Sequence, residues 1–296
     1  MVGPTASGKS AVAMTLAADG VEIVSVDSMQ VYRGMDIGTA KPSPAERHRV
    51  PHHMIDIVDP SDSFSVAEFQ EQGRVALGAI AGSALVVGGS GLHLRALIDP
   101  LEFPPTDSEV RAALEGLDLA GLGARLLAAD PDAATVVDMA NKRRVQRAVE
   151  IWELTGQTPT QRALSASAVA VESYESIDPV AIVGVDPGAE LEARIESRVD
   201  EMLATGWLEE VAALGDRLGP TASGAVGYKE LAAVVKGERN LAEGRTAIVQ
   251  ATRALAKRQR TYFRKDPRIR WLPWRSSLSD RVADAATALK EAKWNS

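Results

Sequence analysis

The chain of 296 residues contains no cysteine, and only 4% of its residues are aromatic. The lack of cysteine excludes disulfides and thiolate-ligated zinc or iron–sulfur sites, and it is typical of a reducing cytoplasm, where we expect this protein. No apolar run approaches the roughly 20 residues that a membrane helix needs, so we expect no membrane partner. The first residues, Met-Val-Gly-Pro, lack the basic and apolar regions of a signal peptide.

Charge is distributed unevenly along the chain. The net charge of −7 excludes a protein that is basic overall. Residues 245–270 nevertheless hold nine basic side chains and one acidic one, a net +8, which leaves −15 for the rest. An asymmetry of this size indicates an anionic partner at one face. A solvated helix face without a partner is the alternative interpretation.

Short apolar runs alternate with helical patterns over the first hundred residues, where an amphipathic helix is predicted at 64–80. Buried strands are predicted, in chain order, over residues 21–26, 54–58, 84–87, 180–185 and 270–274. Strands that alternate with helices predict the α/β class with a parallel sheet.

Residues 105–170 interrupt this pattern, because they show helical periodicity without strand signals. Asp107 and Asp118 are placed to cap two of the helices there. Further helices are predicted over residues 191–205, 207–214, 227–235, 241–264 and 280–293. We therefore expect an α/β core formed by residues 1–104 and 171–296, with an all-helical insertion domain between them.

The first ten residues contain a phosphate-binding loop. The pattern G-x-x-x-x-G-K-[ST] is matched at every fixed position by Gly3, Pro4, Thr5, Ala6, Ser7, Gly8, Lys9 and Ser10. Its backbone N–H groups curl around a phosphate, and the helix predicted over 11–18 points its positive end at the same place. Lys9 supplies a point charge and the Ser10 hydroxyl suits Mg²⁺. Because only Met1 and Val2 precede the loop, we expect either an unusually short first strand or a start downstream of the true one.

A carboxylate follows one of the predicted strands. The strand over 21–26 ends in Asp27, whereas the strand over 84–87 ends in Gly-Gly-Ser-Gly, without the acid that nucleoside triphosphatases use to hold metal. The carboxyl end of a parallel strand lies beside the phosphate loop. Asp27 is therefore placed to accept a proton from an acceptor substrate, although it is also placed to cap a turn with Ser28.

Several further motifs occur in a fixed order. They are Asp27–Tyr32, Met35–Pro42, Pro51–His53, Gly88–Leu92, Val226–Tyr228 and Ala256–Thr261. Together with the phosphate loop they resemble the tRNA dimethylallyltransferase (isopentenyl-tRNA transferase) family, from residue 1 to about residue 272. The resemblance implies a P-loop NTPase-like core. It also implies an enzyme that transfers the dimethylallyl group from dimethylallyl diphosphate to N6 of the adenine 3′-adjacent to the anticodon, in tRNAs reading codons that begin with U.

The resemblance also implies roles for particular residues. The phosphate loop would bind the diphosphate with Mg²⁺ on Ser10, and Asp27 would take the proton of the adenine amine. The anticodon stem-loop of the tRNA would be contacted by Asp27, Ser28, Met29, Gln30, Ser90, Arg111, Arg143, Arg144 and Arg147. In the helix that carries the last three, we expect Arg143 and Arg147 to point away from the apolar side. We expect the enzyme to be a monomer.

The basic segment forms a stripe on the helix predicted over 241–264. Arg253, Lys257, Arg260 and Arg264 are spaced four, three and four residues apart, which places them on one face. Ile248, Leu255 and Tyr262 fall on the opposite face, toward the core. A basic stripe backed by an apolar one is what a helix that follows RNA phosphates needs, so we expect these four cations to bind tRNA.

The chain departs from the family pattern at two positions. His93 stands where the family has tyrosine after Gly-Gly-Thr-Gly-Leu. Gly224 stands where members carry an arginine that helps to bind the diphosphate. Either a neighbour such as Lys229 replaces that arginine, or the diphosphate is bound more weakly.

Three other functions remain open at this point. A small-molecule kinase using ATP would explain the phosphate loop and Asp27 but not the basic stripe. Prenyl transfer to a free adenine nucleotide would need no helical insertion with arginines. An RNA-binding NTPase switch would require binding of a nucleoside triphosphate.

Overall fold

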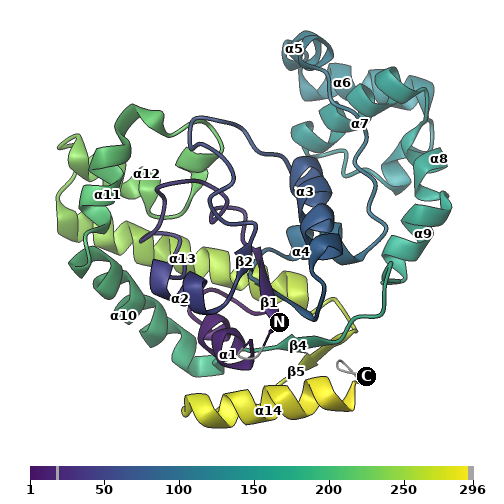
Figure 1. Ribbon diagram of the computed structural model, residues 1–296. Helices are drawn as coiled ribbons and strands as arrows, with labels where there is room; N and C mark the ends of the chain where they lie inside the picture. Colours follow the sequence, from purple (N-terminus) through teal and green to yellow (C-terminus); the bar gives the residue numbers. More distant parts are fainter. Residues whose placement is uncertain (18–19, 293–296) are drawn as a thin grey trace. The chain divides into compact units, whose positions relative to one another are not determined.

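A parallel sheet runs through the first of two compact units, formed by Met1–Ile98 and Pro179–Ser296 (Figure 1). The computed structural model describes residues 1–17 and 20–292. The strands are β1 (Glu22–Val26), β2 (His52–His53), β3 (Ala84–Gly88), β4 (Ile182–Gly184) and β5 (Ile269–Trp271). Val2 forms parallel bridges to Gly88 and Gly184, so it joins the two groups of strands in the order β2-β1-β3-Val2-β4-β5. The expected parallel α/β core is confirmed, and Val2 alone represents the strand before the phosphate loop.

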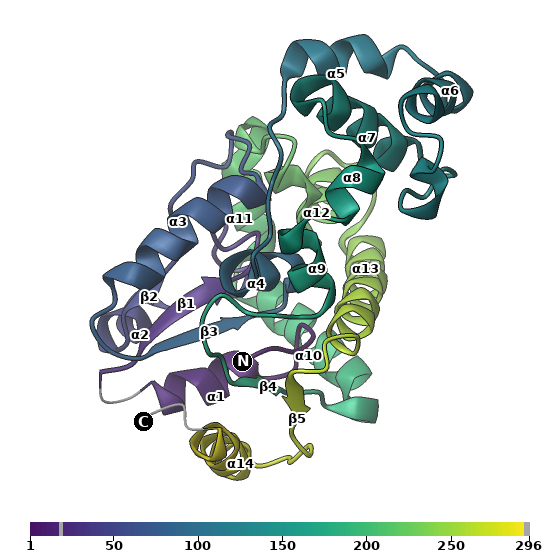
Figure 2. The same ribbon diagram turned by 90° about the vertical axis from the view of Figure 1, so that its right-hand side faces the viewer.

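Helices cover both faces of this sheet. Alternate strand residues point to opposite faces, and Ile23 and Leu85 belong to the core shared with α1 (Lys9–Leu16) and α14 (Leu278–Glu291). Figure 2 shows α14 beside β4 and β5.

The opposite face has the larger core. Val24 belongs to the same buried cluster as Phe69, Ile195 and Tyr228, which come from different helices. Around it lie α3 (Val66–Ala79), α4 (Gly91–Ile98), α10 (Leu191–Ala204), α11 (Trp207–Leu214), α12 (Tyr228–Val235) and α13 (Leu241–Phe263). The sheet is therefore the middle layer of an α/β/α arrangement, as a parallel sheet with two buried faces requires.

The second unit, Asp99–Asp178, is helical throughout its regular structure. Its helices are α5 (Ser108–Glu115), α6 (Leu119–Ala129), α7 (Lys142–Thr155), α8 (Pro159–Ala163) and α9 (Ala166–Glu172). The side chains of Asp107 and Asp118 accept backbone N–H groups at the starts of α5 and α6, as expected. The unit extends beyond the expected 105–170 at both ends, and within it Arg147 donates hydrogen bonds to the carbonyls of Pro104 and Pro105.

One predicted strand is wrong. Residues 54–58 turn instead of extending, because Met54 and Asp56 adopt φ angles of 63° and 57°. Only Val58 forms a bridge, to Tyr32, and the paired strand is His52–His53. Two ends of predicted helices, at Ala18 and Lys293, lie outside the described residues. Within the described chain, none of the helices combines the length and apolarity that crossing a bilayer would require.

Candidate active site

A cavity of about 220 Å³ lies where β1 and β3 end and the phosphate loop begins. Its polar lining comes from Thr5, Lys9, Ser10, Ser25, Asp27, Gln30, Thr39, Arg198, Thr252 and Gln259. Its apolar lining comes from Met29, Val87, Ile195, Val199, Met202, Trp207, Ala225, Val226 and Leu255. A charged end and an apolar wall therefore belong to the same cavity.

The phosphate loop presents free backbone donors at the start of α1. Gly8, with φ of 81°, takes the left-handed conformation that glycine adopts most readily. Among the described residues, the N–H groups of Gly8, Lys9 and Ser10 find no acceptor. The positive end of α1 therefore remains available to an anion.

Another donor of the loop is already engaged. The N–H of Thr5 donates to Oε1 of Gln259 on α13, at 2.8 Å. Gln259 thus fixes the loop from the helix that carries the basic stripe. Its only signal in the sequence is its place in the Ala256–Thr261 motif, and periodicity gives no reason to single it out.

Lys9 is buried at the base of the loop. Its Nζ donates to the carbonyl of Pro4 at 3.3 Å. Burial, and next the charge of Arg198, lower the pKa of Lys9 from 10.5 to about 8, while Asp27 opposes that shift. A bound anion would restore the ammonium form by direct attraction.

Asp27 both caps a turn and lines the cavity. Its Oδ1 accepts the N–H of Met29 at 2.9 Å, so the turn-capping alternative describes a real contact. Among the described residues, Oδ2 accepts no hydrogen bond and is left for a ligand. The two interpretations are therefore compatible, because the turn bond orients the carboxylate that borders the cavity.

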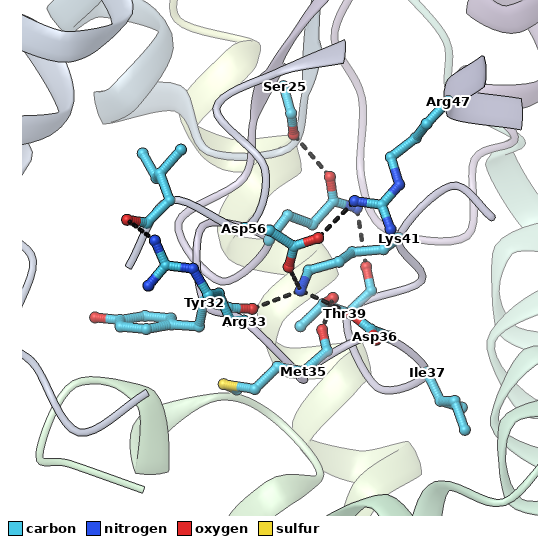
Figure 3. Close-up of polar contacts among 12 residues, drawn as sticks. Ser25, Tyr32, Arg33, Met35, Asp36, Ile37, Thr39, Lys41, Arg47 and Asp56 are labelled. Atoms are coloured by element: carbon cyan, nitrogen blue, oxygen red, sulfur yellow. Dashed lines mark hydrogen bonds and ion pairs between the residues drawn. The ribbon is translucent and has the colours of Figure 1, made fainter. Parts of the chain in front are cut away.

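Gln30 organises the segment after Asp27. Its Oε1 accepts the Ser25 hydroxyl at 2.7 Å, and its Nε2 donates to the carbonyls of Thr39 and Ala40 at 3.0 and 3.3 Å. Figure 3 shows two of these partners, Ser25 and Thr39, near Lys41. Both amide hydrogens of Gln30 are thus engaged within the loop, which limits it to acceptor contacts with a base.

Glu210 on α11 anchors the wall formed by residues 36–40. Its carboxylate accepts the backbone N–H groups of Asp36, Ile37 and Gly38 at 2.8, 2.7 and 3.2 Å, and also the hydroxyl of Tyr228 at 2.6 Å. Sequence reasoning missed Glu210, because nothing local marks a glutamate that acts on a loop more than 170 residues away.

Lys41 holds the same loop from the other side. Its side chain is only 1% exposed, and its Nζ donates to the carbonyl of Tyr32 and to the carboxylates of Asp36 and Asp56 (Figure 3). Although burial raises the pKa of Asp56, the hydrogen bonds from Lys41 and Arg47 outweigh it and hold that pKa below its usual value. The cluster fixes the backbone that forms one wall of the cavity.

We expect Lys41→Met to lower the free energy of unfolding by about 1.5–3 kcal/mol, because charged hydrogen bonds of this kind contribute that much. The Tyr32 carbonyl would lose its donor and Asp56 one of its two cations. Urea denaturation measures the change, with the exposed Lys236→Met as the matched control. An unchanged midpoint for Lys41→Met would show that the cluster does not stabilise the loop.

Ser90 is held by the residue that departs from the family pattern. Its hydroxyl lies 2.7 Å from Nδ1 of His93, whose ring packs edge-on against Phe69. Burial lowers the pKa of His93, with the charge of Asp27 opposing the shift. His93 thus supplies an aromatic ring as tyrosine would. Ser90 itself is not part of the cavity lining.

The arginines of the helical unit differ in whether their guanidinium groups form ion pairs with acidic side chains. Arg111 and Arg147 share the buried carboxylate of Glu150, at 3.2 and 2.9 Å. Arg144 lies 3.4 Å from Asp138, while Arg143 is exposed. The expectation that Arg147 points away from the apolar side like Arg143 is wrong, because its guanidinium forms an ion pair with the buried Glu150. Val145 and Val149 form the buried side of α7.

The basic stripe of α13 is partly paired. Arg253 forms an ion pair with Glu196 at 2.5 Å, and Arg260 one with Asp186. Lys257 is exposed, and Arg264, which is also exposed, lies 3.9 Å from the Asp186 carboxylate. Their role in binding tRNA stays a prediction, but any phosphate at Arg253 or Arg260 would compete with an acid.

The expected apolar side of α13 is only partly correct. Ile248 is buried in the core and Leu255 lines the cavity. Tyr262 is 38% exposed, because the buried positions follow Val249, Ala256 and Phe263 instead.

Comparison with known proteins gives a consistent result. The family model described as IPP transferase matches residues 30–266, and the model described as isopentenyl transferase matches residues 1–56. A tRNA dimethylallyltransferase of Streptomyces coelicolor is 45% identical over 95% of this chain and 91% of its own length.

Solved structures agree with this likeness. A tRNA isopentenylpyrophosphate transferase from Bacillus halodurans is 35% identical, with a TM-score of 0.67 over 99% of this chain and 96% of that chain. A eukaryotic dimethylallyltransferase acting on tRNA is 25% identical, with a TM-score of 0.80 over 99% of this chain and 78% of that chain.

Proposed function

This chain belongs to the IPP transferase family, and on that premise we propose that it transfers a dimethylallyl group from dimethylallyl diphosphate to N6 of the tRNA adenine 3′-adjacent to the anticodon. One observation carries the proposal. A phosphate loop with free N–H donors, a carboxylate and an apolar wall line a single cavity, which suits a ligand with a diphosphate head and a short hydrocarbon tail.

Each part of the cavity has a chemical task. The amine nitrogen of adenine is a weak nucleophile, because its lone pair is delocalised into the ring. Asp27 would orient that amine and accept its proton as the nitrogen–carbon bond forms and the bond from carbon to the diphosphate oxygen breaks. The N–H groups at the start of α1 and the ammonium of Lys9 would stabilise the departing diphosphate.

The residues around the phosphate loop fit a magnesium ion. The Ser10 hydroxyl offers a hard oxygen donor in this cavity. The described residues contain no cluster of three or more His, Cys, Asp or Glu side chains. Magnesium often keeps waters and phosphate oxygens as its remaining ligands, so we propose that Ser10 holds it together with the donor. When bound, the ion would neutralise negative charge on the diphosphate.

Exposed cations offer binding sites for tRNA phosphates. In the helical unit Arg143 is exposed, and in the core unit Lys257 and Arg264 are exposed on α13. We propose that these side chains contact the anticodon stem-loop. The adenine itself must leave the stacked loop to react, which costs least where the nucleic acid is single-stranded.

The decisive experiment is transfer of radiolabelled dimethylallyl from its diphosphate to unmodified tRNA, with ATP turnover assayed in parallel. Label in tRNA without ATP consumption is the expected result. Label in free adenosine monophosphate but not in tRNA would favour a nucleotide prenyltransferase. ATP consumption without label would refute the proposal in favour of a kinase.

Donor binding should weaken above about pH 8, the pKa that burial gives Lys9. Below that pH the free enzyme already carries the ammonium charge that attracts the diphosphate. Above it, binding must take up a proton, because the bound anion raises the pKa of Lys9. We expect kcat/KM for the donor to fall by up to about tenfold per pH unit until the pKa of the complex is reached.

The stability of the ligand-free protein should change in the opposite direction. Between about pH 8 and 10.5 the unfolded chain binds more protons at Lys9 than the folded one, so this residue makes stability rise with pH. Lys9→Arg is the matched control for the kinetic profile, because arginine stays charged throughout this range. A flat profile of kcat/KM for the unsubstituted enzyme would contradict the role given to Lys9.

A further inference from the structure

The position that lacks the family arginine lies at the edge of the cavity. Gly224 is exposed, whereas the next two residues, Ala225 and Val226, line the cavity wall. A Cβ at Gly224 would meet nothing within 4 Å, and its φ is one that any residue adopts. Lys229 is exposed on α12 and is not part of the lining. Lys229, the neighbour expected to replace the missing arginine, therefore does not line the cavity.

A different cation reaches the cavity from α10. Ile195, Arg198, Val199 and Met202 are spaced three, one and three residues apart, so they share one face of the helix. All four line the cavity, and Arg198 is the charged one among them. Lys9 and Arg198 are the two cationic side chains that the described residues contribute to the lining.

Arg198 is partly buried without a partner of its own. Its guanidinium makes no hydrogen bond or ion pair within the described residues, although the charges of Asp27 and Glu201 lie near it. Burial lowers the pKa of Arg198 ahead of any charge effect. A buried cation that lacks a hydrogen-bonded anion costs stability in the free protein. Such a cost is expected where a ligand supplies the anion.

We propose that Arg198 binds the diphosphate of the prenyl donor opposite Lys9 and supplies from α10 the positive charge that is missing at Gly224. The assignment rests on the proposed function. A guanidinium donates two parallel hydrogen bonds to phosphate oxygens, which a single ammonium does not. With Lys9 and the start of α1, it would surround the diphosphate with donors from two elements far apart in the sequence.

The test compares Arg198→Met, Gly224→Arg and the double variant. Isothermal titration with inorganic diphosphate and Mg²⁺ measures the Kd, and prenyl transfer measures KM for donor and tRNA separately. We expect Arg198→Met to raise the Kd and the donor KM by about 10- to 100-fold, the value of a charged hydrogen bond. The KM for tRNA should not change. Gly224→Arg should restore most of the lost affinity in the double variant, because its side chain has open space at the cavity edge.

The urea midpoint of Arg198→Met distinguishes a role in binding diphosphate from a role in stabilising the fold. Methionine keeps the apolar stem and removes an unpaired charge, so Arg198→Met should unfold at the same or a higher urea concentration than the unsubstituted protein. Lys229→Met is the matched control and should leave the Kd unchanged. The proposal is overturned if Arg198→Met binds diphosphate normally, or if it loses stability and is not rescued by Gly224→Arg.

The same experiment distinguishes this inference from the function on which it rests. Diphosphate binding that depends on Arg198, in an enzyme that transfers no label to tRNA, would refute prenyl transfer and leave the anion assignment intact. Normal transfer together with normal diphosphate binding in Arg198→Met would refute the assignment of Arg198 and leave prenyl transfer intact.

Discussion

Asp27→Asn should lower kcat for prenyl transfer by about 10²- to 10⁴-fold, the usual contribution of a positioned general base. Asparagine keeps an oxygen that accepts the N–H of Met29, so the turn after β1 should survive. What the substitution removes is the proton acceptor and the negative charge. At about pH 7, Lys9 is largely protonated, because its pKa is about 8. Steady-state kinetics at this pH therefore measures the loss of the proton acceptor separately from the loss of negative charge.

The KM for the donor provides the internal control for that prediction. The charge of Asp27 raises the pKa of Lys9, so its removal lowers that pKa further and weakens donor binding mainly at higher pH. At about pH 7 the donor KM should change little. A loss confined to donor KM, with kcat unchanged, would show that Asp27 acts only on the electrostatics of the phosphate loop.

The sequence predicts the parts of this site that depend on local patterns. The phosphate loop needs consecutive residues, and Asp27 follows from the rule that ligands bind at the carboxyl ends of parallel strands. Both lie in the same cavity of the structure. The borders of β1 and β3 agree with the predicted runs 21–26 and 84–87 to within one residue, because adjacent apolar residues set them. Residues 54–58 misled because an apolar run does not reveal two positive φ angles.

Contacts over long sequence separations are not visible in this way. Glu210 reaches the backbone of Asp36, and Gln259 reaches Thr5, through folding that no local period encodes. The stripe on α13 shows the related limit. Spacing places Arg253 and Arg260 on one face of the helix. It does not reveal that each forms an ion pair with an acidic side chain from a distant part of the sequence.

Arg198 lies between these two cases. Its place in a three-and-four spacing with Ile195, Val199 and Met202 is legible in the sequence as a charge on an apolar stripe. A charge on a buried face costs free energy unless an anion or a hydrogen-bond acceptor lies beside it. The sequence alone does not say that the face borders the phosphate loop, because α10 and the loop are separated by most of the chain.

Lys9→Met should lower kcat/KM for the prenyl donor by about 10²- to 10³-fold, the size of effect seen when one donor of a transition-state anion site is removed. The ammonium lines the cavity beside the start of α1, where, among the described residues, the N–H groups of Gly8 and Ser10 find no acceptor. Charge on the diphosphate increases as the allylic bond breaks, so kcat should fall as well as the affinity. Single-turnover prenyl transfer separates the two contributions.

The stability of Lys9→Met should not fall with its activity. Burial disfavours the Lys9 ammonium in the ligand-free protein, as its pKa of about 8 indicates, and methionine keeps the apolar stem without that charge. Among the described residues, the one hydrogen bond lost is the long contact to the Pro4 carbonyl, at 3.3 Å. The urea midpoint should therefore match or exceed that of the unsubstituted protein, while titration with inorganic diphosphate and Mg²⁺ shows weakened binding. If stability and diphosphate affinity fall together, Lys9 serves the fold of the loop and the charge argument for the site fails.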